Sequence, residues 1–223
     1  SVKGELAYLI VELSADGYYF NEVSGSLSSA KLTLSALSDL SDSTSVNVNL
    51  MTHLEKKRVE YLIGTGLSFS AAKSQAQGEI LKMFNIDNVT LGNSETLDIS
   101  KSGDGNATLL AISAILQSDK TEVELTELLS TINTDIRTDG SLDSTTTKTN
   151  LLTAVDYLKT RQSTLRTNIA KHGRKPNLSN TAKHDHCRIS PNTAAHGMQQ
   201  ARLDQTRANK PRQRNANRKH GTA

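Results

Sequence analysis

The feature that most constrains the fold is a ten-residue apolar segment, Ala107–Leu116. Drawn as a helix it is hydrophobic around its whole circumference, with Thr108 and Ser113 as its polar residues. A helix of this kind is normally surrounded by other elements. Ten residues are too few to cross a bilayer, which needs about 20. The segment therefore predicts a central core helix with amphipathic helices packed around it, and we expect no membrane span in this chain.

Charge and composition divide the chain near residue 173. Residues 1–173 have a net charge of −6 and contain all eight aromatic residues, whereas residues 174–223 have a net charge of +9 and contain all three prolines. The basic segment has no glutamate and only four large apolar side chains. That is too little apolar surface to offset the conformational entropy lost on ordering fifty residues. We therefore predict that residues 173–223 are a disordered basic tail.

The beginning of the chain predicts a small antiparallel β segment. Residues 5–13 and 18–23 are rich in β-branched and aromatic side chains, and residues 31–37 alternate polar and apolar. Ser14–Gly17 has the composition of a turn between the first two strands. Three short strands are marginally stable alone. We expect residues 1–42 to form a meander or part of a β-sandwich, which needs a second layer.

Residues 43–172 predict a helical domain, because the apolar spacing changes from two residues to the helical period. We expect four amphipathic helices besides the central one. They run over about residues 46–63, from Ser68 to Phe84, from Thr121 to Ile136, and from about Leu151 to His172. Ser68 is predicted to be an N-cap, and Thr121 and Glu124 have the spacing of a capping box. The predicted fold class is therefore α+β, mainly α: a small antiparallel β segment followed by a five-helix bundle-like domain and the tail.

One loop has a spacing related to that of calcium sites. Asp135, Asp139 and Asp143 fall at ligand positions of an EF-hand-type loop, with Gly140 at its turn position. Arg137 occupies another ligand position, and a threonine stands where the closing carboxylate is required. A helix end followed by an Asp-Gly turn is the preferred interpretation. The alternative is a calcium-stabilised interaction module that uses these three aspartates, and no other cofactor is indicated.

The remaining polar motifs point to no enzyme class. His184–Cys187 holds two histidines and the only cysteine, but the second ligand pair of a zinc site is missing. His53 is predicted to be a partly exposed helix histidine. The sequence contains no nucleophile elbow, phosphate-binding loop or dinucleotide fingerprint. We therefore predict a non-enzymatic protein with no catalytic and no cofactor-binding residues.

The basic run Lys210–Lys219 offers a second alternative function. Such a run binds nucleic acid or other polyanions weakly by releasing counterions. It lacks the aromatic side chains that stack on bases. We expect weak polyanion binding through the tail and no specific nucleic-acid partner.

Four stretches of the body resemble one family. They are Asp16–Gly25, Asn47–Lys56, Leu67–Phe69 with Ala76 and Gln77, and Asn133–Gly140. In this order they resemble the N-terminal half of cell-surface lipoproteins of Bacteroidota-type bacteria. Those proteins join a carboxypeptidase-regulatory-like β-domain to a helical domain, and many continue into domains of the Fibrobacter succinogenes major paralogous type.

The resemblance extends from about Gly4 to Ile169 and implies a location as well as a role. It implies a cell-surface, outer-membrane or extracellular protein with a lipid anchor in its full-length form. It also implies a structural or binding module whose partner is an unknown protein or glycan, and it carries no catalytic residues. The family's first strands are missing here, which indicates a truncated N-terminus. After Gly173 the resemblance stops, and we hypothesise that residues 174–223 are an out-of-frame or fused coding segment.

Overall fold

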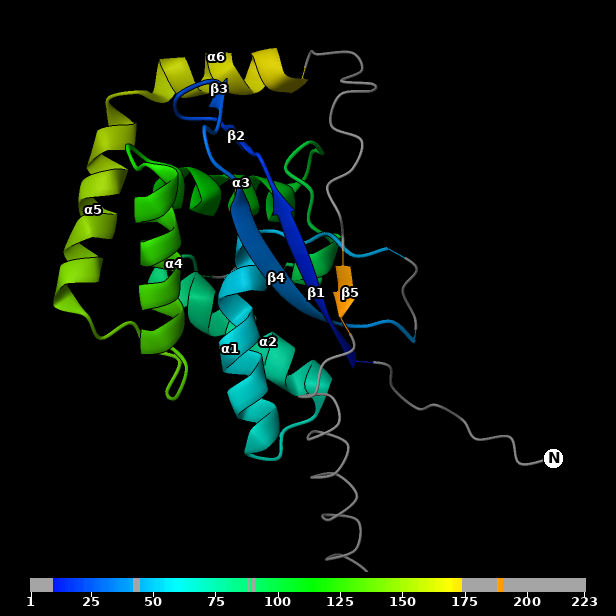
Figure 1. The fold of residues 1–223 in the computed structure, drawn as a ribbon. Coiled ribbons are helices and arrows are strands. Elements are labelled where there is room, and N and C mark those ends of the chain that lie inside the picture. Colours follow the sequence, from blue (N-terminus) through cyan, green and yellow to red (C-terminus); the bar gives the residue numbers. More distant parts are fainter. Residues whose placement is uncertain (1–9, 42–44, 88, 90, 174–187, 191–223) are drawn as a thin grey trace, which may run out of the picture.

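The computed structural model describes residues 10–41, 45–87, 89, 91–173 and 188–190, and these form an α+β structure that is mainly α (Figure 1). The predicted fold class is therefore confirmed. In chain order the elements are β1 (Ile10–Gly17), β2 (Phe20–Asn21), β3 (Ser26–Leu27), β4 (Leu32–Asp39), α1 (Leu50–Gly64), α2 (Phe69–Met83), the 3-10 helix η1 (Ser94–Thr96), α3 (Asp104–Gln117), α4 (Glu122–Asp135), α5 (Thr145–Lys159), α6 (Gln162–Gly173) and β5 (Arg188–Ser190). Most of the predicted tail lies outside the described residues.

The main sheet is built on β1 and β4, which pair antiparallel along their whole length. β5 pairs with the other edge of β1, so the strand order is β4-β1-β5, and β2 and β3 form a separate small hairpin. The predicted turn at Ser14–Gly17 is wrong, because these residues continue β1. Asp16 explains the difference: its carboxylate accepts hydrogen bonds from Thr33 and Lys31 across the sheet, so cross-strand partners replace the local turn bonds.

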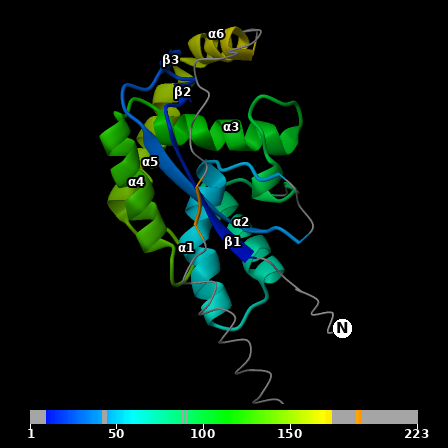
Figure 2. The ribbon, with the colours of Figure 1, turned by 45° about the vertical axis from the view of Figure 1, so that its right-hand side comes forward.

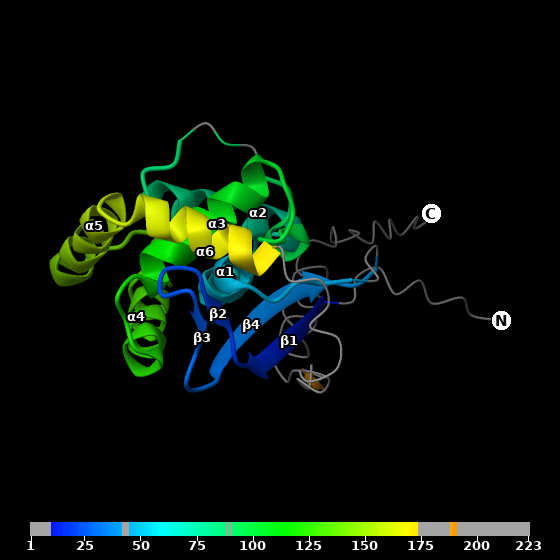
Figure 3. The same ribbon diagram turned by 90° about the horizontal axis from the view of Figure 1, so that it is seen from above.

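Helix α1 supplies the second layer that the β segment needs. Figure 3 shows β1 and β4 on one side of α1, with α2 and α3 on the other, and in Figure 2 the two strands cross in front of α1. Leu37 of β4 packs with Val59 and Leu62 of α1 and with Ala72 and Ala76 of α2. The sheet, α1 and α2 therefore share one apolar cluster, which is separate from the main core.

Helix α3 occupies the centre of the main core, as its sequence predicts. Leu109, Ile112 and Leu116 are each at most 2% exposed. They pack among apolar side chains from every other helix of the core: Met51 and Leu54 of α1, Ile80 of α2, Leu125, Leu129 and Ile132 of α4, and Leu151 of α5. The expectation of burial on every side is wrong, however, because Ala107 and Ala111 are exposed. Alanine leaves little apolar surface in water, so this narrow stripe is tolerated.

The predicted last helix is in fact two helices, so the described chain has six α-helices rather than five. The Thr160 hydroxyl donates to the Tyr157 carbonyl oxygen, and the Arg161 amide donates to the Leu158 carbonyl oxygen in a tight turn. Helix α6 then crosses towards β2 and β3 (Figure 1). There the Asn168 amide donates to the carbonyl oxygen of Glu22. The apolar spacing continues through the bend, so periodicity alone does not reveal it.

A buried charged cluster fixes the long connection between α2 and α3. Lys73 Nζ lies 2.6 Å from Glu55 Oε2 and 2.8 Å from Glu95 Oε2. The Ser94 hydroxyl donates to the other carboxylate oxygen of Glu55, and Gln77 donates to the Ser94 hydroxyl oxygen. Burial alone lowers the pKa of Lys73, but the two carboxylates outweigh it and raise that pKa. The cluster joins α1, α2 and η1 through one cation.

Lys73→Ala should lower the free energy of unfolding by about 3–5 kcal/mol, because it leaves two carboxylates buried without a counter-charge. The loss should be smaller at pH 5 than at pH 8, since protonation of one carboxylate removes the uncompensated charge. Urea unfolding at both pH values measures this. The control is Lys57→Ala, which removes a half-buried lysine of α1 for which the described residues contain no ion pair. Equal losses in the two variants would contradict the role of the cluster.

Candidate functional site

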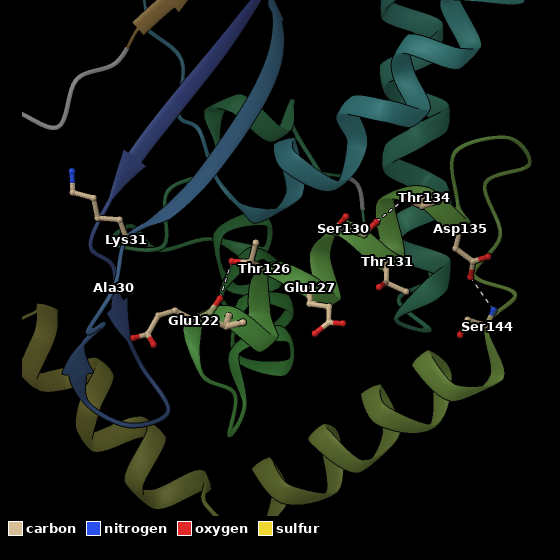
Figure 4. Close-up of a pocket in the computed structure, with 11 residues that line it drawn as sticks. Ala30, Lys31, Glu122, Thr126, Glu127, Ser130, Thr131, Thr134, Asp135 and Ser144 are labelled. Carbon is tan, nitrogen blue, oxygen red and sulfur yellow. Dashed lines mark hydrogen bonds between the residues drawn. The ribbon is translucent and has the colours of Figure 1, made fainter.

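An open groove of about 790 Å³ runs along the exposed face of α4 (Figure 4). Ala30 and Lys31, from the turn before β4, lie at one end, and Asp135 and Ser144 lie at the other. Its floor is the outer face of the helix, made of Glu122, Val123, Thr126, Glu127, Ser130, Thr131 and Thr134. Most of the lining side chains carry a hydroxyl or a carboxylate, but carbon atoms make up most of the lining surface.

The sequence of α4 explains why these side chains face outwards. Leu125, Leu128, Leu129 and Ile132 recur at the helical spacing and are buried against the core, which leaves the intervening polar positions exposed. The predicted capping box is confirmed at the start of the helix: the Glu124 amide donates to the Thr121 hydroxyl, and the Thr121 amide donates to the Glu124 carboxylate. The groove therefore has a rigid floor.

The polar groups that line the groove are mainly hydrogen-bond acceptors. The hydroxyls of Thr126 and Thr134 each donate to a carbonyl oxygen one turn earlier in α4, at 2.8 Å, so their remaining lone pairs are acceptors. The carboxylate of Glu127 makes no hydrogen bond or ion pair with any described residue and is exposed. A ligand that fits these groups must supply donors.

Glu122 joins the groove floor to the turn before β4. Its carboxylate accepts hydrogen bonds from the Ser29 amide at 2.5 Å and from the Ser29 hydroxyl at 3.2 Å. Its own backbone amide and that of Ser29 lower the pKa of Glu122, so this carboxylate is ionised at neutral pH. At the same end of the groove, Lys31 Nζ lies 3.2 Å from Asp16 Oδ2. The lysine at the groove is therefore paired with an acid that does not line the groove.

Two of the three predicted calcium ligands, Asp135 and Asp139, accept cap and turn hydrogen bonds, and Asp143 contributes its backbone amide. Asp135 Oδ2 accepts hydrogen bonds from the amides of Asp143 and Ser144, both at 2.8 Å, which fixes the start of α5. Asp139 Oδ1 accepts from the Ser141 amide at 2.9 Å. Within the described residues, no three His, Cys, Asp or Glu side chains gather as a metal site. The geometry matches the helix-end and turn interpretation, and the calcium module stays a prediction.

His53 links α1 to β4 and is half-buried. Its Nδ1 accepts a hydrogen bond from the Ser35 amide at 3.1 Å, and the Ser35 hydroxyl oxygen lies 3.2 Å from the same nitrogen. Burial, followed by the charges of Lys56 and Lys57, lowers the pKa of His53 to about 4. The ring is therefore neutral and a weak base at neutral pH, with its proton on Nε2. The other motifs noted in the sequence, His184–Cys187 and Lys210–Lys219, lie outside the described residues.

Glu22 is another buried titratable group and is 2% exposed. Burial raises its pKa, although hydrogen bonds from its own backbone and from the Gln117 side chain oppose that shift. Its Oε2 has no hydrogen-bond partner among the described residues. Asn168 and Gln117 approach it from α6 and α3, and the pKa of Tyr19 is raised by burial and by the charges of Glu122 and Glu22. Protonation therefore favours the folded arrangement around Glu22.

The groove was not predicted from the sequence. Each polar residue of α4, taken singly, is typical of a solvated helix face, and Ser29 lies 93 positions before its partner Glu122. The one available signal is the density of Thr, Ser and Glu on a single face of the helix. That signal is weak, because exposed helices commonly carry such residues.

Comparison with protein-family models, with curated proteins and with solved structures found no match in any of the three. Among the described residues, no helix has the length and apolar character needed to cross a membrane. The resemblance to bacterial surface lipoproteins stays a prediction. The proposals below therefore start from the geometry.

His53 should make the protein less stable as the pH falls from 6.5 towards 4. In that range the unfolded chain binds a proton at this position and the folded chain does not, so acid favours unfolding. Between pH 7 and pH 4.5 the free energy of unfolding should fall by about 2.5 kcal/mol more in the wild-type protein than in His53→Gln. Urea titrations across this range provide the measurement. Parallel pH profiles for the two proteins would rule the assignment out.

Glu22 should have the opposite effect. Because its folded-state pKa is raised above 4.5, its contribution to stability is lost as the pH rises through that folded value. Glu22→Gln keeps the shape and removes the charge, so it should raise the melting temperature more at pH 8 than at pH 5. Glu127→Gln, on the exposed face of α4, is the matched control. It should leave the melting temperature unchanged at both pH 8 and pH 5. A lower melting temperature for Glu22→Gln at pH 8 would show that the charged form is the stabilising one.

Proposed function

We propose that this protein is a non-enzymatic binding module of a bacterial cell-surface or secreted protein, and that the groove along α4 is its binding face. The observation that supports this most directly is the lining of the groove by acceptor groups on a rigid helix. Val123, which is 75% exposed, adds an apolar contact at one end. Binding sites combine such fixed polar groups with exposed apolar surface. The surface location rests on the four stretches that resemble bacterial lipoproteins.

The shape of the groove favours an extended ligand. Helix α4 has 14 residues, which corresponds to a length of about 21 Å. An extended peptide of about six residues spans that distance. The groove therefore matches a short linear segment better than a compact small molecule.

The charges of the groove favour a ligand that carries cations. Glu122, Glu127 and Asp135 line it, and the only lysine among the lining residues is Lys31, which contacts Asp16. Lysine and arginine side chains supply both positive charge and hydrogen-bond donors. We therefore place a basic protein segment ahead of a neutral glycan as the ligand.

The proposal is tested with three probes: an eight-residue peptide of alternating Lys and Ser, the same peptide with Glu in place of Lys, and maltoheptaose. The Lys/Ser peptide should shift the backbone amide resonances of residues 122–134, and the other two should not. Glu127→Lys should weaken binding of that peptide at least about fivefold, by removing an attraction and adding a repulsion.

Asp156→Lys is the matched control, because Asp156 is an exposed acid of α5 outside the groove. It should leave peptide binding unchanged. Shifts produced by maltoheptaose alone would replace the basic segment with a glycan as the ligand. The absence of shifts along α4 with all three probes would overturn the proposed binding face.

A further inference from the structure

We propose that a second pocket, between α2, α3 and α5, binds a single-chain amphipathic anion such as a medium-chain fatty acid carboxylate. The pocket has a volume of about 430 Å³, which lies within the range of small-molecule sites. Its apolar walls are Met83 and Phe84 at the end of α2, Ile115 of α3, and Leu151, Leu152 and Val155 of α5. This site is separate from the groove along α4.

The apolar walls are partly in contact with water. Leu152 is 62% exposed, and Ile115 and Val155 are half-buried. Leu142 and Leu151, by contrast, line the same pocket and belong to the buried core. The pocket is thus an extension of the core that remains open on one side. Covering it with an aliphatic chain would remove apolar surface from water.

Two lysines give the pocket its charge preference. Lys82 of α2 and Lys148 of α5 both line it, and both are exposed. The side chains of these lysines make no hydrogen bond or ion pair with any described residue. The one acid in the lining, Glu79, is already bound by Arg58 through two hydrogen bonds of 2.7 and 2.8 Å. The pocket therefore combines an aliphatic interior with two uncompensated cations.

The wall formed by residues 140–142 is held in place without a ligand. Arg58 binds Glu79 and also donates to the Thr138 carbonyl oxygen at 2.6 Å, which ties α1 and α2 to the loop after α4. Gly140 has a φ of +78°, and a Cβ at this position would collide with the carboxylate of Glu79. Only a glycine allows the loop to pack this closely. A preformed wall of this kind reduces the ordering cost of binding.

The ligand class follows from these contacts. A neutral alkane would fill the walls but leave both lysines unused, and a cation would be repelled by them. A carboxylate on an alkyl chain matches both the apolar walls and the two lysines. Its chain lies on the walls, and its head group lies near the ammonium groups. A second carboxylate on the ligand is not required.

Isothermal titration of the full chain with decanoate, decanol and decyltrimethylammonium tests the proposal, at concentrations below micelle formation. Decanoate should bind. Octanoate, titrated in parallel, should bind more weakly, by about fourfold for each methylene that it lacks. Decanol should bind more weakly than decanoate, and decyltrimethylammonium should not bind. Equal affinities for decanoate and decanol would overturn the role of the lysines.

Two sets of variants complete the test. The double variant Lys82→Glu with Lys148→Glu should weaken decanoate binding at least tenfold and leave decanol binding unchanged. The control double variant Lys101→Glu with Lys171→Glu changes two exposed lysines outside the pocket and should alter neither affinity. Leu152→Asp, at an exposed position that the fold tolerates, should abolish binding of both ligands while the circular dichroism spectrum is retained. Unchanged decanoate binding in the first double variant, or in Leu152→Asp, would overturn the site.

The surface of an anionic membrane also presents alkyl chains with negatively charged head groups, so it is a second source of the same ligand chemistry. Sedimentation with vesicles of phosphatidylglycerol distinguishes it from a free fatty acid. Binding of decanoate without vesicle sedimentation supports the proposal. Vesicle sedimentation that depends on Lys82 and Lys148, without decanoate binding, would overturn it in favour of the membrane.

Discussion

The arrangement of the helices depends on one buried cation. An ammonium group removed from water must be paired, and Lys73 finds its two carboxylates on different elements, Glu55 on α1 and Glu95 on η1. The connection that carries η1 is otherwise irregular, with Leu97 buried in the main core and Ile86 and Leu91 packed against it. Asn49 reinforces the same attachment, since its side chain donates to the Ser94 carbonyl oxygen at 2.8 Å. Because this connection leads directly into α3, the cluster also determines where the central helix enters the core.

Local chemistry was predictable from the sequence, and long-range pairing was not. Ser68 and the Thr121–Glu124 capping box were assigned correctly, because a cap uses residues within one turn of each other. Ser14–Gly17 was misassigned because partners in β4 override its turn preference. The bend at Thr160 was missed because the apolar spacing runs through it. The charged cluster brings together Glu55 and Lys73, 18 positions apart, and the groove brings together Ser29 and Glu122, 93 positions apart, and no periodicity encodes such contacts.

The stretches that carry the family resemblance have architectural roles in this structure. Asn47–Lys56 includes the capping box of α1, formed by Asn49 and Thr52. Asn133–Gly140 supplies the carbonyl oxygens of Arg137 and Thr138 that accept hydrogen bonds from Arg58. The two proposed binding regions are instead formed mainly by other residues, on the outer face of α4 and beside α5. These stretches therefore account for the scaffold of this chain, and its ligands must be argued from the surfaces themselves.

The hydrogen bonds between Asn168 and the turn after β2 have a consequence for the order of folding. They join residues 146 and 145 positions apart, and Gly25 makes the approach possible because it carries no Cβ to collide with the Asn168 amide. Contacts of such large sequence separation form late, since the intervening chain must first be ordered. During synthesis, the turn between β2 and β3 therefore cannot form these hydrogen bonds until α6, the last helix described, has been made. Until α6 arrives, Glu22 lacks one of its covering elements, so the newly made chain passes through a stage in which this carboxyl group is still in water.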